Sequence, residues 1–465
     1  MNTKALRQKI LDLAIHGKLV PQDPNDEPAS VLLERIRDEK ERLIKEGKIK
    51  RPKKTKATSD KPHYENEPFE VPSSWVWTTV GEISQSILYG VSESAKSRGT
   101  YRLLRITDIQ DNTVNWNTVP FTDYEDEKAE AYLLKDGDIL FARTGATVGK
   151  SYLVNNLQEK AIYASYLIRV KTNHYVLPEF VKYFFESGFY WEQVLGNSVG
   201  IGQPNVNGTI LSNLELPIPP IMEQKRIVKE LGKWLSIIDK IEESKGQLQK
   251  NISWAKSKVL DLAIHGKLVP QDPTDEPATE LLKRINPKAE ITSDNGHYQK
   301  LPEGWAILKV GNVAEYINGR AFKPEEWEQT GLPIIRIQNL NDPNAYYNYT
   351  RNEYEEKYLI KKGDLLFAWA ASLGTYIWKG EDAWLNQHIF KVVPYPFMDK
   401  KYLYYAFHAM IAEFYRKSHG SGMIHITRKQ FEEITLWLPP LTEQHRIVHY
   451  LQQVFKKLDS IVENL

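Results

Sequence analysis

The chain contains no cysteine, no long apolar run and no strong excess of either charge. Without cysteine, disulfides, thiolate-bound zinc, iron–sulfur clusters and thiol catalysis are all excluded. No window approaches the length of a membrane-spanning helix, and the charged N-terminal stretch lacks the apolar core of a signal peptide. The 61 Lys and Arg residues balance 60 Asp and Glu residues, so any nucleic-acid surface must be local. We therefore expect a soluble, cytoplasmic protein of several domains.

Signatures of catalysis are also absent from the sequence. Residues 145–151 end like a phosphate-binding loop, but the spacing of their glycines is one residue too short. The dinucleotide-binding glycine motif, the zinc-protease HExxH motif, the GxSxG elbow and the amino-methyltransferase motif do not occur. We expect no catalytic residues, no metal and no cofactor in this chain.

Two segments of the chain are nearly identical. Residues 11–36 and 260–285 share 22 of 26 positions at an offset of 249. Weaker repeats follow at shrinking offsets and pair 71–83 with 301–313, 137–149 with 363–375, and 214–228 with 434–448. The helical pieces are nearly duplicated, whereas the globular pieces keep only a skeleton of Gly, Pro, Trp and apolar positions. The repeat predicts one scaffold that holds two similar modules with different surfaces.

The first copy carries extra residues between 36 and 71, including the basic run 48–56 with six positive charges in nine residues. This run is compatible with a solvated linker and equally with a strap that contacts phosphates.

A long helix is predicted after Pro219-Pro220. Apolar residues alternate at spacings of four and three over 221–269, which is typical of a coiled-coil seam. A second copy of the seam starts near the C-terminus and resumes at the N-terminus. The simplest geometry is pseudo-twofold, with the intact helix antiparallel to the split one and with adjacent termini. Alternatively, each apolar stripe covers only its own module. The predicted seam includes Ile227, Leu231, Trp234, Ile238, Ile241, Leu248, Leu451 and Leu458.

The two modules share three motifs in the same order: a Pro-x-x-Trp opening at 72–75 and 302–305, a Gly-Asp-[Ile/Leu]-Leu-Phe segment at 137–141 and 363–367, and a Pro-Pro-x-x-Glu-Gln-x-Arg-Ile-Val exit at 219–228 and 439–448. With this ordered, duplicated set the chain resembles the DNA-specificity subunit of type I restriction–modification enzymes. The resemblance covers essentially the whole chain.

The resemblance implies an α+β fold with two target-recognition domains separated by two long helical regions. It implies helical regions at 1–54, 216–286 and 436–465 and recognition domains at 55–215 and 287–435. Each domain would read one half of a bipartite, asymmetric DNA target, while the helices set the spacing and dock two modification subunits. Those partners would bind S-adenosylmethionine, and a motor/nuclease subunit, if present, would bind ATP and Mg. The alternative is a bivalent protein–protein scaffold with no DNA contact.

Candidate DNA contacts are polar residues at positions where the two copies share a frame but differ in identity, because base edges are read mainly by such side chains. Arg105 and Arg336 match each other, so a structural or phosphate-binding role is also open for them. Arg143 faces Trp369 in the alignment, which suggests different base contacts, or one phosphate and one stacking contact. The candidates are Arg98, Arg102, Arg105, Thr107, Arg143, Thr144, Lys150, Gln203, Asn205, Asn207, Arg336, Gln338, Asn339, Trp369, His425, Thr427 and Arg428.

Within the modules, residues 137–142 and 164–170 are expected to form strands. Residues 178–194 and 399–417 are expected to form amphipathic helices whose aromatic side chains lie in the core. His16 and His265, each followed by Gly, are expected to end helices rather than to bind metal.

Overall fold

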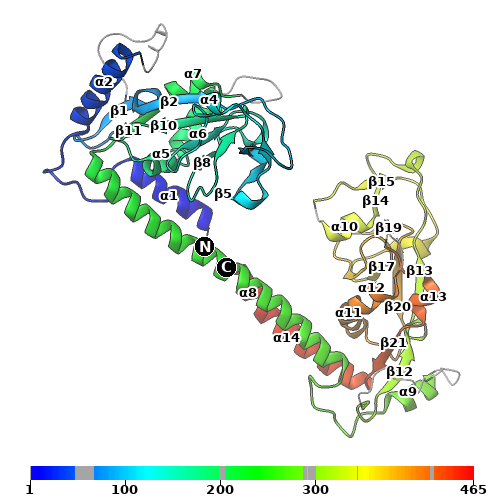
Figure 1. The fold of residues 1–465 in the computed structure, drawn as a ribbon. Coiled ribbons are helices and arrows are strands. Elements are labelled where there is room, and N and C mark those ends of the chain that lie inside the picture. Colours follow the sequence, from blue (N-terminus) through cyan, green and yellow to red (C-terminus); the bar gives the residue numbers. More distant parts are fainter. Residues whose placement is uncertain are drawn as a thin grey trace. The chain divides into compact units, whose positions relative to one another are not determined.

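The computed structural model describes residues 2–47, 67–197, 205–285, 291, 300–342, 344–418 and 424–465. The chain divides into unit 1, Met1–Ser244, and unit 2, Lys245–Leu465, and each is described by itself. Both combine helices with small sheets, which confirms the α+β class (Figure 1). The basic run 48–56 and Gln203 lie outside the described residues.

Unit 1 contains a four-stranded antiparallel sheet of order β2-β10-β7-β8, a second sheet of order β6-β3-β9, and the pairs β1-β11 and β4-β5. The strands are β1 (Val76–Thr79), β2 (Ser84–Tyr89), β3 (Tyr101–Leu104), β4 (Ile109–Gln110), β5 (Thr113–Val114), β6 (Phe121–Thr122), β7 (Ile139–Ala142), β8 (Ser151–Leu153), β9 (Ala161–Tyr163), β10 (Leu167–Thr172) and β11 (Glu215–Ile218). The helices are α1 (Thr3–Ile15), α2 (Ala29–Lys45), α3 (Val80–Ile83), α4 (Asp126–Ala129), α5 (Pro178–Phe184), α6 (Gly188–Asn197), α7 (Gly208–Asn213) and the first part of α8 (Ile221–Ile264).

Unit 2 repeats this plan. Its sheets have the orders β13-β20-β17-β18, β15-β14-β19-β16 and β12-β21. The strands are β12 (Ala306–Lys309), β13 (Ala314–Asn318), β14 (Leu332–Ile335), β15 (Asn348–Thr350), β16 (Leu359–Ile360), β17 (Leu365–Ala368), β18 (Gly374–Ile377), β19 (Ala383–Leu385), β20 (Ile389–Pro394) and β21 (Thr435–Leu438). The helices, besides the rest of α8, are α9 (Ala278–Ile285), α10 (Ile337–Asn341), α11 (Lys400–Ala409), α12 (Ile411–Lys417), α13 (Arg428–Glu432) and α14 (Leu441–Glu463).

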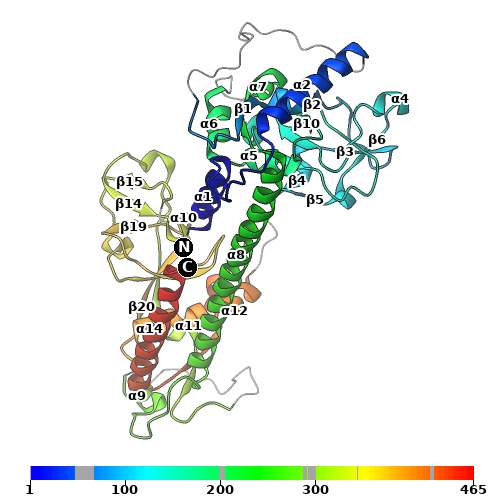
Figure 2. The same ribbon diagram turned by 90° about the vertical axis from the view of Figure 1, so that its left-hand side faces the viewer.

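The central strands β7 and β17 are apolar on both faces. In β7, Ile139 and Phe141 belong to the main core with the helices. Leu140 and Ala142 belong to a second core, which includes residues of β3 and β9 and which we call the core of the small lobe. In β17, the alternation is the same. Because side chains of a strand alternate between faces, a strand covered on both sides reads as a continuous apolar run. In Figure 2 the small lobe of unit 1, with β3, β6 and α4, lies at the edge of that unit.

The expected helix 178–194 is wrong as a single element, because α5 and α6 are separate. The backbone N–H of Gly188 donates to the carboxylate of Asp12 in α1 at 3.3 Å, and the Ser187 hydroxyl accepts from the Tyr190 N–H. These bonds start a new helix at Gly188. The segment 399–417 is likewise divided at Met410. Several aromatic side chains of these helices are in the core as expected, since Phe180, Phe184, Tyr190, Phe407 and Phe414 are at most 1% exposed, but Tyr415 is 38% exposed.

The long helix α8 has 44 residues and continues through Gly246. Its predicted seam is only partly right. Ile227, Leu231 and Ile238 are fully buried, but Trp234 is 42% exposed and Leu235 is buried in its place. The buried residues of this half belong to the core of unit 1, which contains both the module and α1, so here the stripe packs on its own module and on the helix α1 together. In unit 2, Leu451 is buried, whereas Leu248 is 38% exposed.

Each unit contains an antiparallel helix pair. In unit 1, Arg7 of α1 pairs with Asp239 of α8, while Gln22, beyond the end of α1, reaches Glu223 at the start of α8. Figure 1 shows α1 beside this half of α8. In unit 2, Lys256 pairs with Asp459 of α14, and Gln271 with Glu443. The closure of the split helix and the adjacency of the termini remain predictions.

None of the helices in the described ranges is long and apolar enough to cross a membrane. The Nδ1 of His16 and that of His265 each donate a hydrogen bond to the carbonyl of the residue four positions earlier, at the end of their helix. Among the residues that the structure describes, no group of three His, Asp or Glu side chains is placed so that it could hold a metal ion.

Candidate nucleic-acid interface

In unit 1, the end of β7 is joined to the segment before α7. Thr144 forms a β-bridge with Asn205, and the Val206 N–H donates to the Arg143 carbonyl at 3.0 Å. Val206 is buried and its two neighbours are exposed. The Asn207 side chain accepts from the Ile210 N–H and caps α7. Asn205 is thereby held next to Arg143 at the surface.

In unit 2, the end of β17 has the same arrangement. Ala370 forms a β-bridge with His425, and the Ile426 N–H donates to the Trp369 carbonyl at 3.0 Å. Ile426 is buried, and Thr427 caps α13. The backbone bonds thus match Arg143 with Trp369 and Asn205 with His425, as the sequence repeat predicts.

In both units the side chain at the matched position, Arg143 or Trp369, contacts the last residue of a nearby strand. The Arg143 guanidinium lies 5.0 Å from the ring centroid of Tyr89, the last residue of β2. The Trp369 indole N–H donates to Asn318, the last residue of β13, at 3.2 Å. Strand pairing places Tyr89 opposite Ile168 and Asn318 opposite Phe390. The contact is therefore between a cation and an aromatic ring in unit 1, and between an indole N–H and a side-chain amide in unit 2.

A second residue is hydrogen-bonded to the backbone of Arg143 and of Trp369. The Arg143 N–H donates to the carbonyl of Tyr166, whose side chain is 61% exposed. The Trp369 N–H donates to the carbonyl of His388 at 3.1 Å, and the two rings are 5.2 Å apart. Burial, and after it the charge of Arg336, lowers the pKa of His388. A neutral imidazole can both donate and accept a hydrogen bond.

Two predicted candidates of unit 1 are committed to partners within the chain. The Arg102 guanidinium binds both oxygens of Glu159, donates to the Val119 carbonyl at 2.7 Å, and stacks 3.9 Å from the Phe121 ring centroid. Arg105 binds both oxygens of Asp108 in the turn that follows β3. These bonds explain both residues without DNA.

The matching turn of unit 2 also uses its polar side chains internally. Asn339 is 5% exposed, accepts from the Arg336 N–H at 3.0 Å, and donates to the Tyr346 carbonyl at 3.1 Å. The Arg336 guanidinium lies 5.7 Å from the ring centroid of Trp327. Gln338 is exposed and donates to the same carbonyl of Tyr346 at 3.4 Å.

The other candidates are at the surface. Lys150 lies just before β8, Arg428 pairs with Glu432 on α13, and Thr107 lies in the turn after Arg105. The exposed candidates in the described ranges are Arg98, Thr107, Lys150, Asn205, Asn207, Gln338, His425, Thr427 and Arg428.

Sequence reasoning missed Tyr89, Tyr166, Asn318 and His388. Each lies outside the matched polar segments from which the candidates come, and each belongs to a strand or turn separated along the chain from the residue that it contacts. A signal was present in the glycines that follow Tyr89 and Asn318. A Cβ on Gly90 or Gly319 would approach a backbone oxygen to 2.2 or 2.1 Å, so these glycines mark the place where the two sheets meet.

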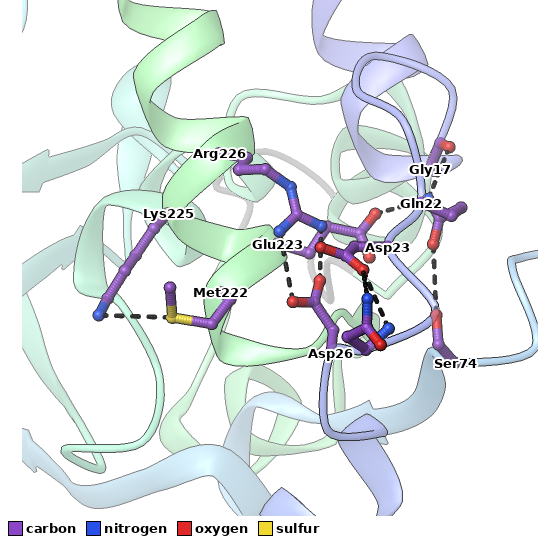
Figure 3. Close-up of polar contacts among 10 residues, drawn as sticks. Gly17, Gln22, Asp23, Asp26, Ser74, Met222, Glu223, Lys225 and Arg226 are labelled. Atoms are coloured by element: carbon purple, nitrogen blue, oxygen red, sulfur yellow. Dashed lines mark hydrogen bonds and ion pairs between the residues drawn. The ribbon is translucent and has the colours of Figure 1, made fainter.

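The identical exits of the two modules have a structural role at the start of α8 and α14. In Figure 3, Gln22 donates to Glu223 at 2.6 Å and to the Gly17 carbonyl, and Arg226 binds both oxygens of Asp26. The buried Gln224 accepts from the Leu177 N–H and donates to the Pro219 carbonyl. Burial raises the pKa of Glu223.

Unit 2 contains the same network. Arg446 binds both oxygens of Asp275, and Gln271 reaches Glu443, which also accepts from the indole of Trp305 at 3.0 Å. Burial raises the pKa of Glu443, and Arg446 lowers the pKa of Asp275. The buried Gln444 accepts from the Asp399 N–H at 2.7 Å. The Glu-Gln-x-Arg motif therefore fastens each helix to its module.

The sequence model of the family described as type I restriction modification DNA specificity domain matches residues 72–250 and 302–465. The chain belongs to this family. Each matched range begins at a Pro-x-x-Trp opening and includes the Glu-Gln-x-Arg motif at the start of α8 or α14. Membership makes the chain a sequence-specific DNA-recognition subunit, the component of these systems that is not catalytic.

Individual relatives agree with this assignment. The chain is 32% identical to the type I restriction enzyme EcoAI specificity subunit of Escherichia coli, over 72% of this chain and 67% of that one. It is 25% identical to the EcoEI specificity subunit of the same organism, over 99% and 90%. A solved chain from a type I restriction–modification system covers 85% of this chain and 94% of its own length with a TM-score of 0.58 at 20% identity, which supports the fold.

Proposed function

We propose that the chain reads a bipartite, asymmetric DNA sequence, with one half-site for each unit. The observation that carries this proposal is the shared frame at the ends of β7 and β17. The same backbone bonds present Arg143, Asn205 and Tyr89 in one unit, and they present Trp369, His425 and Asn318 in the other. One frame with two sets of side chains suits two different base sequences.

The chemistry of the two sets differs. An arginine can donate two hydrogen bonds to guanine, and an asparagine can pair with adenine in the major groove. The Arg143 guanidinium lies over the Tyr89 ring, with its Nε buried without a hydrogen-bond partner among the described residues, and its terminal nitrogens are proposed to donate to a base or a phosphate. In unit 2 the ring of Trp369 offers an apolar contact, and His425 a hydrogen-bonding edge. The exposed candidates Arg98, Lys150 and Arg428 suit phosphates.

The helices are proposed to set the spacing of the half-sites. At about 1.5 Å per residue α8 is about 66 Å long, whereas half-sites one turn apart are about 34 Å apart. Inserting four residues at Gly246, and four in the matching split helix, should lengthen the permitted gap. An unchanged gap would count against this role.

The proposed partners are two modification subunits, which bind S-adenosylmethionine and methylate adenine, and in some assemblies a motor/nuclease subunit that uses ATP and Mg. The chain would then act in the cytoplasm, on duplex DNA. A protein–protein scaffold is disfavoured by membership of a DNA-specificity family. The DNA affinity of the assembled complex should fall steeply with salt, because phosphate contacts release counterions.

The decisive experiment co-expresses the chain with its companion subunits and maps the methylated adenines across the genome. Arg143→Ala should relax the sequence at one half-site by about 10-fold, since a good base contact is worth about 1–3 kcal/mol. Trp369→Ala should relax the other half-site.

Lys128→Ala is the matched control for charge, because Lys128 is exposed and forms an ion pair with Glu125 in the same turn. It should leave both half-sites unchanged. Uniform weakening at all sequences by both Arg143→Ala and Trp369→Ala would contradict base reading at these positions.

A further inference from the structure

The last residue of β2 and the last residue of β13 occupy the same backbone position, although one is Tyr89 and the other is Asn318. Strand pairing places Tyr89 opposite Ile168 and Asn318 opposite Phe390. In each unit the next residue is a glycine, whose N–H donates at 3.1 Å to the carbonyl of the residue before that partner. Both side chains are exposed, so packing does not dictate which residue stands there.

Each of these residues supports the side chain at the end of the central strand, but by a different contact. The Arg143 guanidinium lies 5.0 Å from the Tyr89 ring centroid, where the electrons of the aromatic face attract a cation. The Trp369 indole N–H instead donates to the Asn318 side chain at 3.2 Å. Both contacts restrict a long side chain before any ligand binds, which lowers the conformational entropy that binding costs.

A third position differs between the units together with these two. The helix α7 begins at Gly208 and α13 begins at Arg428, each directly after its N-cap residue. The Gly208 N–H donates to the Tyr89 hydroxyl at 2.6 Å, and a Cβ on Gly208 would lie 3.3 Å from the Tyr89 ring, which is tighter than an ordinary van der Waals contact. In unit 2 the strand ends in the smaller Asn318, and the helix begins with the larger Arg428, which is exposed and binds Glu432. A large residue at the strand end thus accompanies glycine at the helix start, and a small one accompanies arginine.

Resting on the proposed function, we infer that one base position of each half-site is determined by a pair of residues rather than by a single side chain. Arg143 or Trp369 contacts the base, and Tyr89 or Asn318 is the positioning residue that orients it. Gly208 belongs with the unit 1 pair, because it leaves room for the Tyr89 ring. We call Tyr89, Arg143 and Gly208 the unit 1 trio. Placed in the same frame of the other unit, this trio should carry its base preference with it.

The test co-expresses the full chain with its companion subunits and compares the methylation of genomic sites that differ at one base. Arg143→Ala and Tyr89→Leu should each lower discrimination at the same position of one half-site by about 10-fold, which is the size of effect expected for one base contact. The double variant should lose no more than Arg143→Ala alone, because residues that act as a unit are not additive. The other half-site should stay unchanged.

Tyr89→Phe is the matched control, because it keeps the ring beside Arg143 and removes only the hydroxyl that accepts from the Gly208 N–H. Its discrimination should stay within about 2-fold of the wild type, since the attraction of the cation depends on the ring. This control separates the support of Arg143 from a general loosening of α7.

In unit 2 the corresponding variants remove the bond between the indole and the amide. Trp369→Phe and Asn318→Leu should each lower discrimination at the same position of the second half-site. Combining the two variants should add no further loss, because either one already breaks the bond.

Asn318→Tyr, Trp369→Arg and Arg428→Gly together place the unit 1 trio in unit 2. This triple variant should prefer, at the corresponding position of the second half-site, the base that unit 1 prefers. Asn318→Tyr with Trp369→Arg alone should show the change more weakly, because Arg428 remains where the ring needs space.

The inference is overturned if the losses of Arg143→Ala and Tyr89→Leu add, if the two variants relax different positions, or if Tyr89→Phe loses as much as Tyr89→Leu. It is also overturned if the assembled triple variant keeps the original preference of unit 2. Because discrimination is a ratio between sites, a variant that yields less complex still reports it. The proposed function fails separately, if the wild-type complex methylates DNA without any sequence preference.

Discussion

Unit 1 and unit 2 hold the start of a long helix with the same side chains, yet they differ where β7 and β17 end. Gln22, Asp26, Gln224 and Arg226 recur at the same places in the second unit with the same bonds. Arg143 recurs as a tryptophan. Bonds that the fold needs tolerate no change, whereas an exposed side chain on a fixed backbone can change with the sequence to be read.

Removing a shared bond should produce the largest effect. Gln224→Leu leaves the Leu177 N–H and the Pro219 carbonyl without their partner in the interior. We expect a loss of about 3 kcal/mol in the free energy of local opening, because each buried polar group left unpaired costs about 1–3 kcal/mol. Hydrogen exchange at α5 and β11 measures this loss.

Gln444→Leu is the matched variant in unit 2. It should increase exchange at α11 and β21 by a similar amount and leave unit 1 protected. Equal loosening of both units by either variant would show that the two networks are not independent.

A smaller effect is expected for Arg102, where the units differ. The backbone register places Pro333 of unit 2 at the position of Arg102, as β3 and β14 pair in parallel with β9 and β19. Arg102→Met should weaken the small lobe of unit 1 by about 1–2 kcal/mol through the lost bonds to Glu159 and Val119, measured by hydrogen exchange at β3. The methylation pattern should stay unchanged, and a relaxed half-site would make Arg102 a base contact after all.

The smallest effect concerns an ion pair found in unit 2 at a place that is apolar in unit 1. Arg320, at the position of Val91, binds both oxygens of Glu326. Hydrogen bonds from Arg320 and then from the Lys323 N–H lower the pKa of Glu326 from 4.5 to about 2. Because the folded pKa is lowered, the stabilisation is present above pH 4.5 and is lost as the pH falls toward about 2.

Glu326→Gln should therefore remove a pH dependence of unit 2 between about 4.5 and 2, while the acid response of unit 1 stays the same. Exchange of the β14 and β19 amides as a function of pH measures it. Identical acid profiles for the variant and the wild type would contradict a stabilising role for this pair.

Much of the fold could be predicted from local patterns. The repeat, the start of α8 after Pro219-Pro220 and the strands around Ile139 and Leu365 follow from the spacing of apolar residues and from proline, which are properties of short stretches. The prediction that Trp234 is buried is wrong, because a heptad pattern assumes a single helical partner, whereas this part of α8 packs on its module as well as on α1. Leu235 is buried there instead.

The sequence by itself determined that there are two related modules, where the long helix begins, and which family the chain belongs to. Only the tertiary structure decided which polar side chains are bound to partners within the chain. Arg102 finds Glu159 57 residues away, and Arg143 lies on Tyr89 from another strand. Such pairs form between segments that meet only after the sheets assemble, so no local spacing reveals them.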